Sequence, residues 1–160
     1  MAQRQEFTIF ADYFQFYIQD EHATGDLSES WTQDAVDRLL AIAPGCVGVG
    51  TVRNMDVPVT VEIAEAAPNE DLNQWDHVNE CSIDVPSGRL VIAGCTDYFP
   101  DAARMELDKG TYRVRICYGN LKTISANGLE GSDHYRVFLW PAPPGPPTIL
   151  KQRTKPDIAQ

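Results

Sequence analysis

Apolar and polar side chains alternate along the stretch that decides the fold, Val57-Pro58-Val59-Thr60-Val61-Glu62-Ile63. The valines and the isoleucine fall on one face and the other residues on the opposite face, which is the period of a half-buried β-strand. Residues 111–118 repeat the pattern, with Tyr112, Val114, Ile116 and Tyr118 on one face. The chain therefore contains at least two strands that each need an apolar partner layer.

Shorter segments of the same kind lie on both sides of these strands. Turn-forming residues such as Pro44-Gly45 and Pro86-Ser87-Gly88 separate them. The further candidate strands are residues 6–13, 16–19, 46–53, 78–85, 90–93, 103–107, 135–140 and a short edge strand at 148–150. Together they predict a mainly β fold, an antiparallel β-sandwich of about 8–10 strands.

One segment, residues 32–43, has the period of a helix instead. It places Val36, Leu39 and Leu40 on one side, and Pro44-Gly45 ends it. Either Ser30, three positions before Gln33, or Thr32 supplies the N-cap. We expect one amphipathic helix over about residues 32–43 that packs on one side or end of the sandwich.

The chain has 160 residues, the length of one domain. We assign residues 1–150 to that domain, with a stiff proline-rich stretch at 141–147, and residues 151–160 to a flexible tail. No apolar run approaches the ~20 residues that cross a bilayer, and no apolar region of a secretory signal follows Met1. We therefore expect a cytoplasmic protein.

The four cysteines, Cys46, Cys81, Cys95 and Cys117, form no C-x-x-C pair that would indicate zinc or thiol-redox chemistry. Each lies in or beside an apolar segment, so we expect reduced, buried thiols. Asp76-His77 with Glu80 and Asp133-His134 bring carboxylates close to histidines in sequence. Along a strand, however, neighbouring positions and positions three apart point to opposite faces, so neither set predicts a catalytic or metal site. We expect no catalytic residue, no metal and no cofactor.

Charge divides the chain unevenly. The formal net charge is −10, yet residues 1–80 hold fifteen acidic and three basic side chains, a balance of −12. An acidic half repels the phosphates of nucleic acid and anionic lipid headgroups, so direct binding to either is not expected. Acidity favours solubility, and it can also steer a basic protein partner.

The chain resembles the ComJ family of bacterial competence proteins, small acidic proteins that inhibit a DNA-entry nuclease. The matching residues are Tyr13-Phe14-Gln15-Phe16, Trp31-Thr32 with Ala35, and Lys109-Gly110-Thr111-Tyr112. The end of the chain, with the 135–140 strand and its prolines, resembles related uncharacterised bacterial proteins. The resemblance implies the fold and an inhibitory role, and it carries over no binding residue.

The leading hypothesis is a non-enzymatic inhibitor or immunity protein that blocks a basic bacterial toxin or nuclease. Carboxylates would stand in for the phosphates of nucleic acid, and Trp75, in an acidic loop, would be the apolar anchor. The expected partner-binding residues are Asp20, Glu21, Asp26, Glu29, Glu65, Glu70, Asp71, Trp75 and Asp76. A homodimer is compatible with this hypothesis.

Two other function classes remain open. A carbohydrate- or small-ligand-binding sandwich would use Trp75, Trp140 and the long 120–132 loop. A hydrolase would be built on His77 or His134 with nearby carboxylates.

Overall fold

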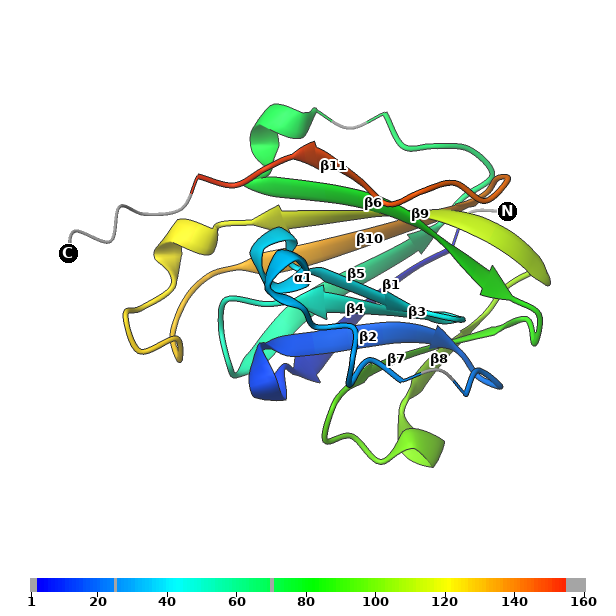
Figure 1. Cartoon of the computed structure of the whole chain (residues 1–160), viewed down its shortest axis with the longest axis horizontal. Coiled ribbons are helices and arrows are strands. Elements are labelled where there is room, and N and C mark those ends of the chain that lie inside the picture. The colour runs from blue at the N-terminus through cyan, green and yellow to red at the C-terminus, as the bar shows by residue number, and fades with distance from the viewer. Residues whose placement is uncertain (1–2, 25, 70, 155–160) are drawn as a thin grey trace.

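The computed structural model describes residues 3–24, 26–69 and 71–154, and these form two β-sheets that share one hydrophobic core (Figure 1). The larger sheet has six strands in the spatial order β1 (Gln3–Phe10), β5 (Asp56–Ile63), β10 (His134–Pro141), β9 (Gly110–Gly119), β6 (His77–Val85) and β11 (Thr148–Lys151). The smaller sheet has five, in the order β3 (Leu40–Ala43), β4 (Cys46–Gly50), β2 (Gln15–Asp20), β7 (Arg89–Gly94) and β8 (Ala103–Glu106). One short α-helix, α1 (Gln33–Arg38), and four 3₁₀ turns, η1 (Asp12–Phe14), η2 (Leu72–Gln74), η3 (Phe99–Asp101) and η4 (Leu121–Thr123), complete the described elements.

The mainly β fold in two packed sheets is confirmed. The alternation in β5 has the predicted consequence, because Val57, Val59 and Val61 are all fully buried. The described residues form eleven strands rather than about 8–10, and the sandwich is not wholly antiparallel. β10 runs parallel to β5, with Tyr135 opposite Val59. No hairpin links these two strands, so no local turn fixes their relative direction.

The helix is shorter than the sequence predicts. The Thr32 side chain accepts a hydrogen bond from Ala35 N at 3.2 Å, so Thr32 and not Ser30 is the N-cap. At the other end Leu39 takes a left-handed conformation (φ 60°, ψ 35°), and residues 40–43 pair with β4 as strand β3 instead of continuing the helix. The expected helix over 32–43 is therefore wrong beyond residue 38.

Buried polar side chains from the larger sheet hold the chain at the point where the helix ends. Asn79 Nδ2 donates to the Arg38 carbonyl at 2.7 Å, and His77 Nε2 lies 2.8 Å from the same oxygen. The Tyr118 hydroxyl donates to the Leu39 carbonyl at 2.5 Å. These bonds satisfy carbonyls that another turn of helix would have used, and a contact between the two sheets thereby overrides local helix propensity.

The outer face of the larger sheet carries a second apolar cluster. It consists of Trp75, Val78, Cys117, Phe138 and Trp140, all buried, with Leu72 and Ala142 packed against them. Trp75 and Leu72 come from the connection between β5 and β6, of which the structure describes residues 64–69 and 71–76. Glu80 accepts hydrogen bonds from Arg113 and Arg115, each at 3.0 Å, beside the cluster. Other parts of the same chain therefore bury the apolar side chains on this face.

The proline-rich stretch leads to the predicted edge strand. Arg113 donates to the carbonyls of Gly145 and Pro146, and β11 then pairs antiparallel with β6. The first part of the expected tail is held in place, since Arg153 N donates to His77 Nδ1 at 3.0 Å. Residues 155–160 lie outside the described residues. No helix within the described ranges has the length and apolar character needed to cross a membrane.

Candidate functional site

The two acidic segments predicted to form one patch lie in different parts of the molecule. The loop that follows β2 lies beside the smaller sheet, in the lower half of Figure 1, and the connection that contains η2 lies at the top of the same view, beyond β6. The structure therefore does not bring the predicted residues together.

Two carboxylates of the first segment are used inside the molecule. Asp20 is 2% exposed and accepts hydrogen bonds from Ser87 N at 3.0 Å and Ser87 Oγ at 2.6 Å. Glu21 pairs with Arg104 at 2.7 Å and Arg89 at 3.2 Å, and the hydrogen bond from Arg104 leads the effects that lower its pKa. Asp20 is thus a structural residue, and the charge of Glu21 is balanced by two arginines.

Asp26 and Glu29 remain exposed on the same segment. The Ser28 side chain and backbone both donate to Asp26 and lower its pKa, so this carboxyl stays ionised at neutral pH.

The second segment is mostly structural as well. Trp75 is 4% exposed and its ring centroid lies 5.1 Å from that of His134, so it is a core residue of the outer cluster and not an exposed anchor. Asp76 accepts from Leu121 N at 2.7 Å, and Asp71 caps η2 by accepting from Asn73 N at 2.9 Å. Asp71 and Glu65 are exposed. Glu70 lies outside the described residues.

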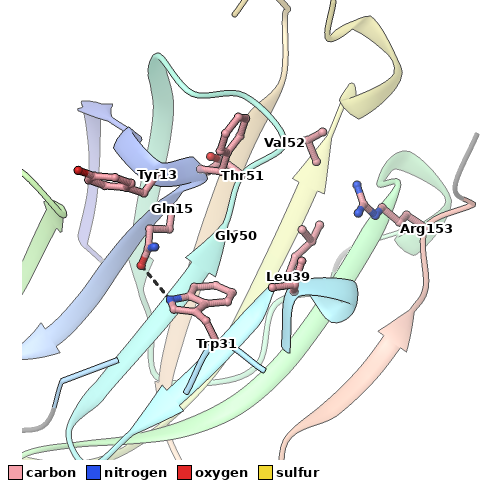
Figure 2. Close-up of a pocket in the computed structure, with 10 residues that line it drawn as sticks. Tyr13, Gln15, Trp31, Leu39, Gly50, Thr51, Val52 and Arg153 are labelled. Carbon is pink, nitrogen blue, oxygen red and sulfur yellow. Dashed lines mark hydrogen bonds between the residues drawn. The ribbon is translucent and has the colours of Figure 1, made fainter. Parts of the chain in front are cut away.

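The structure shows instead a groove on the outer face of the smaller sheet, of about 460 Å³. Figure 2 shows its lining residues from η1, from the end of β4, from α1 and from the chain after β11. The lining is Tyr13, Phe14, Gln15, Trp31, Val36, Leu39, Gly50, Thr51, Val52 and Arg153. The Trp31 indole donates to Gln15 Oε1 at 2.9 Å and separates this groove from a neighbouring hollow that Asp26 lines.

Glycines on β4 allow neighbouring residues to approach this part of the sheet closely. A Cβ atom at Gly48 would lie 2.6 Å from Leu27 and 2.9 Å from Trp31, and one at Gly50 would lie 3.1 Å from Leu39. The strand therefore lets Leu27, Trp31 and Leu39 pack directly on its backbone, and Gly50 lines the groove. None of the expected site residues lines this groove.

The rim of the groove carries two exposed aromatic residues on a strained turn. Tyr13 and Phe14 both have φ of 60°, and their exposed fractions are 69% and 46%. A non-glycine residue in this conformation costs on the order of 1–3 kcal/mol and persists only where its surroundings enforce it. Here Asp12 Oδ1 accepts from Tyr13 N at 3.0 Å, and Thr51 N donates to the Phe14 carbonyl at 2.8 Å.

The site residues expected from the sequence did not include Tyr13 or Phe14. A strand alternates its faces, so adjacent Tyr13 and Phe14 cannot both point inward, and this signal was available in the sequence.

Of the two histidines considered for a hydrolase, His134 is half-buried against the Trp75 ring and His77 is fully buried. His77 is 0% exposed, and both of its ring nitrogens contact backbone groups, of Arg38 and Arg153. Burial lowers the pKa of His77. Asp133 binds Arg53 at 2.6 Å and also receives the Tyr135 hydroxyl. Over the described ranges, no three or more His, Cys, Asp or Glu side chains are grouped so as to hold a metal ion.

The four cysteines are free thiols, three buried and Cys95 exposed. Burial raises the pKa of Cys46 and Cys81 to about 12, so these thiols are protonated and unreactive at neutral pH.

Comparison with solved structures gives two similar chains. One is ComJ from Bacillus subtilis, described as an inhibitor of the DNA-degrading activity of NucA, with a TM-score of 0.71 and 17% identity over 89% of this chain and 99% of that one. The chain has a ComJ-like fold. The other is a protein described as crocagin biosynthetic gene J, with a TM-score of 0.62 and 24% identity over the same shares of the two chains. Neither a family model nor a curated protein sequence matches the chain.

Proposed function

We propose that this protein is a non-enzymatic inhibitor that binds a DNA-degrading nuclease and blocks its active cleft. The observation that carries the proposal is the ComJ-like fold, which extends over 89% of this chain and 99% of a protein described as a nuclease inhibitor. The net charge of −10 supports it, because the cleft of a nuclease is built to attract an anion. The partner is a basic nuclease or toxin of a bacterium, and the inhibitor meets it in the cytoplasm.

The contact surface differs from the one that the sequence suggested. Asp26 and Glu29 are the exposed carboxylates of the first acidic segment, and Asp26 lies across the Trp31–Gln15 pair from the groove. Tyr13 and Phe14 take the place of the buried Trp75 as apolar anchors, since exposed aromatic residues are typical of interface hot spots. Carboxylates beside exposed aromatic rings suit a cationic cleft with an apolar wall.

The test measures DNA degradation by the nuclease encoded beside this protein's gene, with and without the purified protein. We expect stoichiometric inhibition at low ionic strength that weakens as salt screens the charges. Loss of both exposed charges, in Asp26→Asn with Glu29→Gln, should weaken inhibition by roughly tenfold, about 1.4 kcal/mol of binding free energy.

The matched control is Glu65→Gln with Asp71→Asn, which removes the same charge from the other acidic segment. Asparagine preserves the cap of η2, so this variant should inhibit like the unaltered protein. Undiminished DNA degradation at low salt with the unaltered protein would refute the inhibitor role. Equal losses in both double variants would refute the contact surface and leave the role standing.

A further inference from the structure

Among the described residues that line the groove beside Trp31, Arg153 is the one with a charged side chain. The rest of the lining includes the apolar side chains of Val36 and of Trp31 and Leu39, the last two labelled in Figure 2. Small-molecule sites are usually concave, mostly apolar and about 300–1,000 Å³ in volume, with a few polar groups that orient the ligand. At about 460 Å³ this groove fits that description.

The Arg153 side chain has an unpaired hydrogen-bond donor among the described residues. Its Nε atom is buried and has no hydrogen-bond partner in the structure, among the described residues. Burial lowers the pKa of Arg153, and the nearby Asp37 acts in the opposite sense and favours the charged form. Buried donors are nearly always paired, and an unpaired one calls for an explanation such as a ligand. A carboxylate is the partner that a guanidinium binds best, because two parallel N–H groups match its two oxygens.

The strained turn is an independent sign of function at the same place. Tyr13 and Phe14 hold left-handed backbone conformations at the groove rim, and such strain gathers at ligand clamps and binding sites. Phe14 is also the side chain that a Cβ atom at Gly128 would approach to 3.1 Å, so the 120–132 loop buttresses the rim rather than forming the site.

We propose that this groove binds a small organic acid with an aromatic or branched apolar body. Its carboxylate pairs with Arg153, and its body packs between Trp31, Val36 and Leu39. The ligand is a free small molecule, because the cavity is the size of a single small ligand and offers one cation for one acidic group. This site does not depend on nuclease inhibition, and both tests can be read separately.

The experiment uses two probes of nearly equal shape, indole-3-acetate and its neutral amide, indole-3-acetamide. Each is titrated into the isotopically labelled protein without nuclease, and the Arg153 Nε–H and Trp31 Nε1–H signals are followed by NMR. We expect the acetate to bind at least tenfold more tightly than the amide and to shift both signals. The Trp75 and Trp140 indole signals should stay in place, because these side chains belong to the cluster on the other sheet.

Substitutions of arginine test which positive charge makes the protein prefer the acetate to the amide. Arg153→Gln should lower acetate affinity to that of the amide, and Arg153→Lys should restore part of the difference. Arg4→Gln removes an exposed arginine that lies near Glu6 and should leave both affinities unchanged. Equal affinity of the two probes for the unaltered protein would overturn the proposal, whatever the variants do. So would shifts confined to signals outside the groove, or no shift at millimolar probe.

Discussion

The outer faces of the two sheets differ in how the chain covers them. On the larger sheet, Trp75 packs in one cluster with Phe138 and Trp140 of β10, and all three are buried. On the smaller sheet, Trp31 also covers the outer face, but it packs against Gly48 of β4. The Trp75 ring is enclosed by apolar side chains of the strands it lies on. The Trp31 ring packs directly on the backbone of Gly48, stays part-exposed and borders the groove.

The largest expected effect tests this contrast between the tryptophans. Trp75→Ala should lower the free energy of unfolding by about 3–5 kcal/mol, because it leaves a cavity in a closed cluster. Trp31→Ala should cost only about 1–2 kcal/mol, because the Trp31 ring is part-exposed and already borders a cavity. Urea unfolding of both variants measures the difference. Equal costs would mean that the outer faces are equally closed.

A smaller and opposite effect is expected at the groove rim. Tyr13→Gly should raise the free energy of unfolding by about 0.5–1 kcal/mol, because relief of the left-handed strain exceeds the entropic cost of glycine. Tyr98→Gly is the control: Tyr98 is 70% exposed, much like Tyr13, but has an ordinary φ of −72° and should lose stability. If Tyr13→Gly is destabilised as much as the control, the turn stores no strain. Gain of stability with loss of inhibition or probe binding would show that the strain serves binding.

The smallest effect concerns the contact between the sheets at His77. Burial lowers its pKa from the ordinary 6.5, and its Nδ1 accepts from Arg153 N while Asn79, Tyr118 and the Arg38 carbonyl surround the ring. Below about pH 6.5 the unfolded chain therefore binds a proton at His77, whereas the folded protein keeps this side chain neutral. The free energy of unfolding should fall as the pH drops from about 6.5 to the lowered pKa.

Urea unfolding between pH 7.5 and pH 5 measures this slope. His77→Gln should reduce the slope, whereas replacement of the exposed His22 by glutamine should preserve it. Stability that is flat or rises on acidification in the unaltered protein would contradict the burial of a neutral His77.

The candidate site shows where sequence reasoning stops. Trp75 lies among carboxylates in the sequence, which favoured an exposed anchor, but its ring belongs to an apolar cluster with Phe138 and Trp140 of β10, which are remote in the chain. The sequence left the Asp20 carboxylate available for a partner, but in the fold it accepts a hydrogen bond from Ser87. Residue type and neighbourhood in the sequence did not reveal either contact, because Phe138 and Trp140 of the cluster, and Ser87 beside Asp20, each lie more than fifty positions away.

The sequence by itself determined the mainly β architecture, the bounds of most strands and the inward faces of β5 and β9. Alternation is a local pattern, and burial follows from it wherever a second layer exists. Only the tertiary structure decided that residues 40–43 form a strand, that Trp75 is enclosed while Tyr13 is exposed, and that Arg153 borders an apolar groove. These outcomes depend on which distant segments of the chain pack against a given surface, and only the packing of the whole chain determines that.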